Sequence, residues 1–212
     1  MMWWYDVGFA TLATLYMVLI STFLVVLFGL PLGTWLFCAR NIAHQKWVST
    51  SLDALINTFR SIPFIILLVA LIPVTRFMIG TSIGIHAAIV PLSIAAIPFF
   101  ARLVDNIYLN LPTGLLEAGS TMGANTFQMI RYILLPEACA PLIQASTVTA
   151  ITLINYSAMA GAVGAGGLGD LAIRYGYQRF NIPVMIITIV ILITMVHVFQ
   201  WLGDKLSQRF VH

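Results

Sequence analysis

The run Val7–Ala39 reads VGFATLATLYMVLISTFLVVLFGLPLGTWLFCA and contains no Asp, Glu, Lys or Arg over 33 residues. A helix that crosses a bilayer needs about 20 mostly apolar residues, because each residue adds about 1.5 Å of length. The run is longer than this requirement. It therefore predicts one long, tilted membrane-spanning helix together with its entry segment.

Composition extends this prediction to the whole chain. Of 212 residues, 60% are hydrophobic and 8% are charged, whereas a typical soluble domain has about 25% charged residues. So few charges cannot cover a water-soluble surface. We therefore expect an all-α integral membrane protein, with the lipid bilayer around it and residues 1–212 in a single domain. The net charge of +3 is too small to indicate binding to nucleic acid.

The gaps between charged residues predict five membrane spans, since a charge at mid-membrane costs roughly 2.5–3.5 kcal/mol. The predicted spans cover residues 7–39, 61–75, 85–100, 138–169 and 180–203. The second is short and crosses the bilayer only if Arg60 and Arg76 lie at opposite interfaces. No acidic residue falls within a predicted span.

The basic residues predict the orientation of these spans. If the loop after the first span is cytoplasmic, that side holds seven of the ten Lys and Arg residues, namely Arg40, Lys46, Arg60, Arg102, Arg131, Lys205 and Arg209. Cytoplasmic loops carry an excess of basic residues. We therefore expect the N-terminus outside and the C-terminus in the cytoplasm.

A polar segment, about residues 113–136, interrupts the apolar pattern between the third and fourth spans. Thr113 follows a proline and is expected to cap a first short helix. Glu117 is expected early in this helix, where the helix dipole favours a carboxylate. Gly123 suits the left-handed position just after a helix end. The pattern predicts one short helix that ends at this glycine.

A second short helix is predicted directly after the first. Asn125 is expected to cap it, with Gln128 as the reciprocal partner of a capping box. An apolar stripe lies along the helix and consists of Phe127, Ile130 and Leu134. Pro136 cannot continue a straight helix, so it should redirect the chain into the fourth span.

Two interpretations of this helix pair remain open. An amphipathic pair lying on the inner leaflet explains the caps and the apolar stripe. It does not explain why small residues surround one acid in Glu117-Ala118-Gly119 and at Gly123. Small residues let a partner protein approach the backbone, and a carboxylate gives directional hydrogen bonds at a docking site. Docking of a partner protein is therefore the favoured interpretation.

The fourth span leads into a stretch of small and polar residues that predicts a translocation path. Glycines recur there at Gly161, Gly164, Gly166, Gly167 and Gly169. Non-helical backbone within a membrane is tolerated only where protein buries it or where it lines a cavity. The candidate path or gate residues are Tyr156, Ser157, Met159 and Gly161. The flexible thioether of Met159 could close a pore. Tight helix packing is the alternative explanation for the glycines.

Residues 164–169 also fit the pattern G-x-G-x-x-G of dinucleotide-binding proteins. That pattern requires a preceding strand and an acidic residue about 20 positions further on. Here it follows a predicted membrane helix, and position 189 is an isoleucine. We therefore expect no nucleotide at this turn.

Residue types that carry catalysis or bind metals are scattered along the chain. Cys38 and Cys139 are expected as free thiols near the cytoplasmic ends of helices, since the cytoplasm is reducing. The four histidines have no carboxylate or thiol at ligand spacing; they are His44, His86, His197 and His212. We therefore expect no metal site, no catalytic residue and no cofactor on this chain.

Residues 117–136 resemble the coupling motif of ABC-importer permeases. That motif reads Glu-Ala-Ala, three residues, Gly, nine residues, Ile-x-Leu-Pro. The chain matches it at Glu117, Ala118, Gly123, Ile133, Leu135 and Pro136, with Gly119 in place of the second Ala. Further runs resemble the methionine-uptake permeases in particular, namely residues 59–69, 80–84 and 156–169.

The resemblance implies the type I importer permease fold, a bacterial inner-membrane location and a homodimer. Two separate ATP-binding subunits would hold ATP and Mg²⁺, and an extracytoplasmic substrate-binding (lipo)protein would deliver the substrate. The motif G-x-x-x-x-G-K-[ST] is absent from the chain, which implies a non-catalytic transport subunit.

The resemblance also implies roles for residues. The contact with the ATPase would be formed by Glu117, Ala118, Gly119, Gly123, Ile133, Leu135 and Pro136. The implied substrate is methionine, in D and L forms. One alternative is a permease for another polar amino acid. Another is a secondary amino-acid transporter, which would normally show inverted repeats or an acid at mid-membrane.

Overall fold

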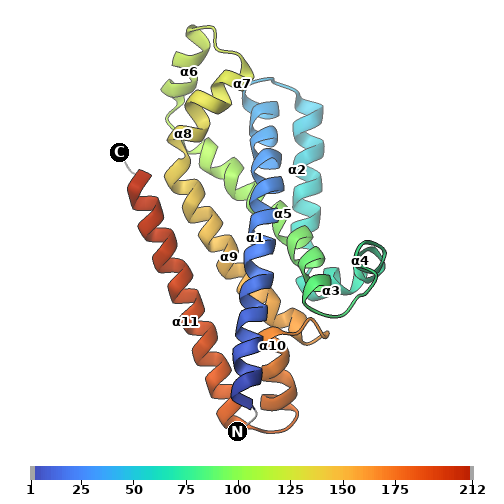
Figure 1. The fold of residues 1–212 in the computed structure, drawn as a ribbon. Coiled ribbons are helices and arrows are strands. Elements are labelled where there is room, and N and C mark those ends of the chain that lie inside the picture. The colour runs from blue at the N-terminus through green and yellow to red at the C-terminus, as the bar shows by residue number, and fades with distance from the viewer. Residues whose placement is uncertain (1–2, 211–212) are drawn as a thin grey trace.

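A computed structural model describes residues 3–210, and every regular element in this range is helical (Figure 1). The α-helices are α1 Trp3–Asn41, α2 Lys46–Ser61, α3 Phe64–Ala70, α4 Ile72–Ile79, α5 Ile85–Leu109, α6 Thr113–Thr121, α7 Thr126–Met129, α8 Leu135–Glu137, α9 Cys139–Gly161, α10 Gly167–Leu171 and α11 Ile182–Ser207. Two π-helical segments and a final 3-10 turn cover Ile130–Leu134, Ala172–Tyr177 and Gln208–Phe210. The all-helical prediction is confirmed.

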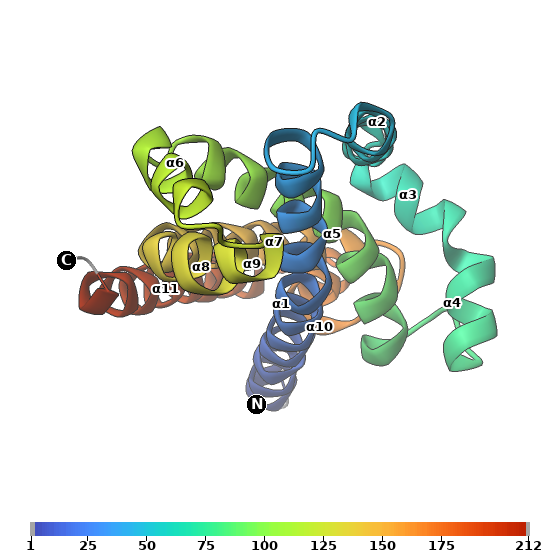
Figure 2. The ribbon, with the colours of Figure 1, turned by 90° about the horizontal axis from the view of Figure 1, so that it is seen from above.

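The first predicted span is one unbroken helix, α1, which continues through Pro31. It packs against α5 (Figure 2), and two glycines allow the backbones to approach. A Cβ atom on Gly33 would meet the carbonyl oxygen of Ala101, and one on Gly29 would lie 2.9 Å from the ring of Phe100. Small residues at such contacts permit close packing of membrane helices.

The prediction of one helix over residues 61–75 is wrong. The chain forms α2, bends by 100° into α3, and breaks again at Leu71 before α4. Pro63 explains the bend, because the residue before a proline avoids the helical region. Ile62 is accordingly extended, with φ −81° and ψ 123°. In Figure 1, α2 lies alongside α1, and α3 and α4 turn away to the side.

The third predicted helix is longer than expected and reaches Leu109 rather than stopping near Phe100. Its additional turns contain Arg102 and Asp105, and the Asp105 side chain is fully buried. Asp105 lies outside the predicted span of residues 85–100, but the helix that forms this candidate span includes it. Charged residues inside membrane helices normally pair with one another, and these two do.

Asp105 is the centre of a group of ion pairs that joins three helices. Arg40 of α1 donates hydrogen bonds to both carboxylate oxygens of Asp105, at 2.8 and 3.0 Å. Arg102 donates to Asp105 at 3.2 Å and to Asp53 of α2 at 2.5 Å. Arg102 also donates to the side-chain oxygen of Asn57 at 2.9 Å. These bonds fix α2 against α1 and α5.

The fourth and fifth predicted spans correspond to α9 and α11. The helical segment Thr126–Glu137 and α9 meet at an angle of 72°, so the predicted redirection after Pro136 is confirmed. α9 and α11 pack side by side, and a Cβ on Gly203 of α11 would overlap the hydroxyl of Thr147 of α9. The chain ends lie apart, with the N-terminus below and the C-terminus in the upper half of Figure 1.

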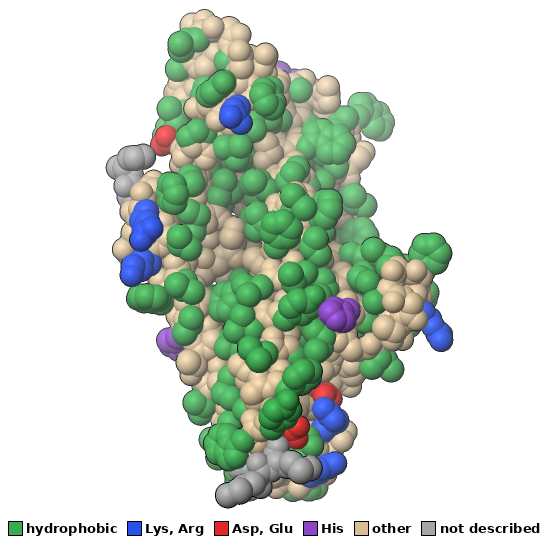
Figure 3. All heavy atoms as spheres, in the orientation of Figure 1, with side chains coloured by type: hydrophobic (Ala, Val, Ile, Leu, Met, Phe, Trp, Pro, Cys, Tyr) green, Lys and Arg blue, Asp and Glu red, His purple; other side chains and the backbone are tan. Residues whose placement is uncertain are grey.

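The structure allows between three and five membrane spans. Among residues 3–210, three helices are long and apolar enough to cross a bilayer alone, namely α1, α5 and α11. The count becomes five if the pairs α2–α3 and α7–α9 each form one bent span. Hydrophobic side chains cover much of the surface, as Figure 3 shows for one face, with a cluster of charged side chains near the end where α1 begins.

Replacement of Asp105 by alanine should strongly destabilise the protein. Two arginines would lose their buried partner, and removal of one member of a buried ion pair typically costs roughly 3–5 kcal/mol. Thermal unfolding of the detergent-purified protein measures the effect. Asp170→Ala is the matched control, since its partner Arg174 is 58% exposed and such pairs contribute about 0–1 kcal/mol. Equal melting temperatures for the two variants would contradict this account.

Candidate functional site

The polar segment forms a helix pair at one end of the molecule, where α6 and α7 extend beyond the ends of α1 and α2 (Figures 1 and 2). α6 begins at Thr113 as predicted, but Thr113 does not cap it. Pro112 occupies the N-cap position, and no side chain bonds to the free N–H groups there. Glu117 is the fifth residue of α6 rather than part of its first turn. The predicted favourable position of Glu117 at the start of the helix dipole is therefore wrong.

The predicted turn between the two short helices is confirmed in detail. Gly123 follows the end of α6 with φ +75°, a conformation that costs other L-residues roughly 1–2 kcal/mol. Asn125 and Gln128 form the predicted capping box, in which each side chain accepts the backbone N–H of the other at 2.8 and 2.9 Å. Together these contacts fix the angle between the two helices.

Gly119 lies between the two helices and not on the outer surface. It is buried, and an added Cβ would lie 2.5 Å from the Met129 sulfur and 2.6 Å from the Cδ1 atom of Ile133. The prediction that Gly119 contacts a partner is therefore revised, and we assign Gly119 to packing. Both neighbouring atoms are ends of flexible side chains, so the alanine of the importer motif could also be accommodated here.

The outward surface of the pair carries the remaining small residues and large apolar side chains. Glu117, Ala118 and Gly123 are exposed. Met122 is 86% exposed and Phe127 is 69% exposed. Exposed apolar side chains around a single acid are a surface suited to docking.

The last residues of the motif connect this surface to the membrane helix α9. Ile133 and Leu135 are half-buried, whereas Pro136 is exposed. Ile133 lies within the π-helical turn, and Pro136 lies two residues before the bend at Ala138. Proline cannot donate a helical hydrogen bond, and π-helical turns accommodate such interruptions. A displacement of α7 would therefore be passed to α9 through a covalently continuous segment.

The four candidate path residues lie on the last turns of α9, away from the helix pair. Tyr156 stacks on Phe64 of α3, with ring centroids 4.4 Å apart and planes 2° apart. Ser157 is buried and donates to the carbonyl of Ile154 at 2.7 Å. Met159 is 45% exposed. The structure thus places Tyr156 and Met159 where another molecule could reach them and places Ser157 against its own helix.

Gly161 and the glycines that follow make a tight turn into α10. A Cβ on Gly161 would overlap the backbone of Gly169 and Asp170. Gly164, Gly166 and Gly167 all have positive φ angles, between 76° and 87°. The buried Thr14 hydroxyl of α1 accepts the Leu168 N–H at 2.8 Å. Close packing therefore accounts for Gly161.

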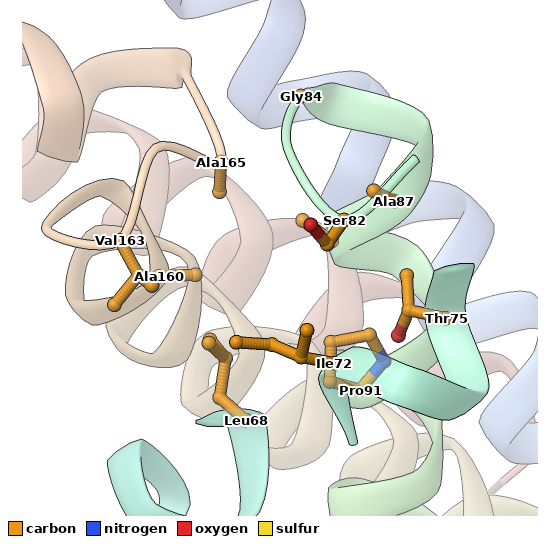
Figure 4. Close-up of a pocket in the computed structure, with 11 residues that line it drawn as sticks. Leu68, Ile72, Thr75, Ser82, Gly84, Ala87, Pro91, Ala160, Val163 and Ala165 are labelled. Carbon is orange, nitrogen blue, oxygen red and sulfur yellow. The ribbon is translucent and has the colours of Figure 1, made fainter. Parts of the chain in front are cut away.

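A pocket beside this turn is shown in Figure 4. Its walls come from α3, α4, the start of α5 and the end of α9, and include Leu68, Thr75, Ser82, Pro91 and Ala160. The backbone N–H of Gly84 donates to the carbonyl of Gly164 at 3.0 Å, which joins the loop before α5 to the turn after α9. About 20 Å³ of the pocket is accessible to water, enough for about one water molecule.

The end of the molecule where α1 begins carries a charged cluster that the sequence did not indicate. Arg174 donates to Asp170 at 2.8 Å, and these hydrogen bonds raise the pKa of the guanidinium. The Tyr175 hydroxyl donates to Asp6 of α1 at 3.3 Å, and Arg179 lies 4.6 Å from the Tyr175 ring. The i,i+4 spacing of Asp170 and Arg174 is the sequence feature from which this ion pair could have been predicted.

Two histidines make local contacts, and both cysteines are unpaired. Cys38 and Cys139 are free thiols. His86 meets the Tyr16 ring edge-on at 5.6 Å, and His197 lies 2.8 Å from the carbonyl of Ile193. Residues 3–210 contain no group of three or more His, Cys, Asp or Glu placed to hold a metal; His212 lies outside the described residues.

Comparisons with known proteins relate this geometry to a family. A family model described as binding-protein-dependent transport system inner membrane component matches residues 29–212. A Vibrio cholerae protein named probable D-methionine transport system permease protein MetI is 48% identical over 205 residues, 96% of this chain and 91% of that protein. A Pasteurella multocida protein of the same name is 48% identical over 211 residues, 99% of this chain and 97% of that protein.

A solved structure of the inward-facing MetNI methionine ABC transporter has the same fold. It superposes with a TM-score of 0.96 at 46% identity, over 98% of this chain and 97% of that chain. The bent helices and the protruding helix pair are therefore features that this chain is expected to share with that structure.

Replacement of Gly123 by valine should damage the helix pair, whereas the same change at Gly114 should not. Neither glycine has an atom within 4 Å of an added Cβ, but only Gly123 has a positive φ angle. A loss in Gly123→Val relative to Gly114→Val therefore reports on position 123, through its backbone conformation or through the exposed surface on which it lies. Substrate uptake by the assembled transporter measures the effect, with membrane insertion as the check on folding. Normal uptake in Gly123→Val would overturn the assigned role of the turn.

Proposed function

The chain belongs to the family of binding-protein-dependent transport system inner membrane components, and from this premise we propose that it is the substrate-conducting permease subunit of an ATP-driven importer. It is a multi-pass inner-membrane protein with the type I ABC-importer permease fold. The observation that carries the proposal is the capped helix pair α6–α7, which projects from the membrane helices and exposes one acid among small and apolar residues.

ATP hydrolysis belongs to a partner in this proposal. The helix pair docks on an ATP-binding subunit through Glu117, Ala118 and Gly123, with Gly119 holding the two helices together from inside. Ile133, Leu135 and Pro136 connect the docked surface to α9. ATP and Mg²⁺ are bound by two such partner subunits, and this chain supplies the membrane path without a catalytic residue.

The proposed substrate is methionine, in D and L forms. Support comes from two relatives at 48% identity, each named probable D-methionine transport system permease protein, and from the methionine transporter that shares the fold. Another polar amino acid is the alternative substrate. Uptake of labelled methionine in the presence of competing amino acids separates the two.

The proposed assembly is a homodimer with the path between its two copies. Its orientation places the N-terminus outside and the C-terminus in the cytoplasm, with five spans formed by three continuous helices and two bent pairs. The helix pair then faces the cytoplasm. The charged cluster around Asp170 and Tyr175 faces outward, where a substrate-binding (lipo)protein would deliver the substrate.

Neutralisation of Glu117 should weaken docking of the ATP-binding subunit and thereby reduce transport. Glu117→Gln keeps the size of the side chain and removes its charge, and loss of a hydrogen bond to a charged group is worth roughly 10–150-fold. We expect methionine uptake into proteoliposomes to fall at least about tenfold and less ATPase to co-purify. The liposomes contain this chain, its ATPase and its binding protein.

Glu137→Gln is the matched control, because Glu137 is also exposed but lies in α8, outside the docking surface. Wild-type liposomes that import no amino acid would refute the proposed function. Equal defects in Glu117→Gln and Glu137→Gln would refute only the assigned role of Glu117.

Met159→Ala tests the proposed path. A shorter side chain at this exposed position should leave the path less well closed, so basal ATP hydrolysis should rise or uptake should fall by more than about twofold. Met78→Ala is the control, since Met78 is 62% exposed on α4. Unchanged uptake and unchanged basal ATPase activity in Met159→Ala would remove this residue from the gate.

A further inference from the structure

A second pocket lies where α2 ends and α3 begins, and it has much more room than the pocket of Figure 4. It is lined by the ends of α2 and α3, by α5 and by α9, and about 120 Å³ of it is accessible to water, against about 20 Å³ in the first pocket. One water molecule needs about 10–15 Å³. The second pocket can therefore hold several waters or a small solute, whereas the first cannot.

Arg60 lines this pocket at an unusual place in the chain. It lies in the last turn of α2, two residues before the extended Ile62 and the 100° bend. The pair α2–α3 is one of the two bent pairs long enough to count as a membrane span, so Arg60 lies at the break within that span. A charge within a membrane span is costly and marks a functional site by default.

Arg60 has no acidic partner among residues 3–210, whereas four other charge pairs in this range are made. Arg102 is the instructive comparison, since it lies in the neighbouring helix α5 and bonds to two carboxylates. Each carboxylate in that cluster is already paired with Arg102 or Arg40. The guanidinium of Arg60 is therefore available to an anion from outside the chain.

Four aromatic and three aliphatic residues form the rest of the pocket, the aliphatic ones being Ile62, Leu67 and Ala95. Phe59 and Phe99 line it, as do Phe64 and Tyr156 in their parallel stack. The Tyr156 hydroxyl has no hydrogen-bond partner among residues 3–210, and a phenolic hydroxyl can donate to an anion. The pocket thus combines one cation, one free hydroxyl and apolar rings.

The break in the helix is consistent with a binding site. Discontinuous helices in membranes are tolerated where they line a cavity, and transporters commonly bind substrate at such breaks. The residues here come from α2, α3, α5 and α9, so the pocket would change shape whenever these helices move relative to one another.

We propose that the pocket between Arg60 and Tyr156 is a transient binding site for the transported amino acid, whose α-carboxylate is held by Arg60 and the Tyr156 hydroxyl. This inference rests on the proposed importer function and names a substrate site within it. The aromatic rings accept the apolar side chain, and a thioether makes favourable contacts at ring edges. The ring faces can also attract the α-ammonium group.

Saturation-transfer NMR on the assembled transporter tests the site directly, because it detects weak binding. The probes are methionine and methioninamide, which lacks the carboxylate. Wild type should show stronger transfer to methionine than to the amide. In Arg60→Gln this preference should decrease, and methionine uptake into proteoliposomes should fall at least about tenfold. Arg60→Lys, which keeps the positive charge, should retain part of the preference for methionine and part of the methionine uptake.

Arg76→Gln is the matched control. Arg76 is also exposed, has no acidic partner among residues 3–210, and lies in α4 outside the pocket. Co-purification of the ATPase shows that each variant is folded and assembled. Methionine bound to other subunits contributes equally to the NMR signal of wild type and variants. The difference in saturation transfer between wild type and Arg60→Gln therefore reports on this pocket.

A loss of carboxylate preference in Arg60→Gln alone supports the site. An unchanged preference and normal uptake in Arg60→Gln would overturn it and leave the proposed function intact, as would an equal loss in Arg76→Gln. Absence of any methionine uptake by wild type would overturn the methionine assignment and this site together.

Discussion

The buried carboxylate of Asp105 is the constraint on which the arrangement of the helices depends. A charge at that depth is stable only with partners, and the partners come from α1 and from α5 itself. Arg102 then extends the connection to Asp53 of α2. Because α2 is held in this way, the bend at Pro63 points α3 toward α9 and places Phe64 on Tyr156, in a pocket that Arg60 also lines.

The helix pair and the path are parts of one continuous segment. From Thr126 the chain runs through α7, the π-helical turn and α8, bends by 72°, and continues as α9 to Gly161. The capping box and Gly123 make one end of this segment rigid, and the close packing of Gly161 on α10 fixes the other. In the proposed function, work done on α6–α7 by an ATP-binding partner would therefore reach Tyr156 and Met159 through this segment.

Local chemistry could be predicted from the sequence, whereas tertiary contacts could not. The capping box at Asn125 and the left-handed Gly123 depend on a few neighbouring residues, and both were predicted correctly. Gly119 was expected on the surface because its burial depends on Met129, ten residues away. The helix over 61–75 was predicted because the length of the charge-free run was given more weight than the effect of Pro63. The ion pairs of Asp105 could not be predicted, because they join residues up to 65 positions apart in the sequence.

The walls of the Arg60 pocket differ in how firmly they are held, and this difference bears on transport. α2 is fixed near its middle by a charged hydrogen bond from Arg102 to Asp53, while beyond the bend Phe64 of α3 meets Tyr156 through a parallel ring stack. Ion pairs and hydrogen bonds are directional, but stacked rings tolerate offsets. In the proposed site, a change in the angle at the bend would shift Phe64 on the Tyr156 ring and so alter the shape of the pocket that Arg60 lines. A site that binds substrate in one state would then release it in another.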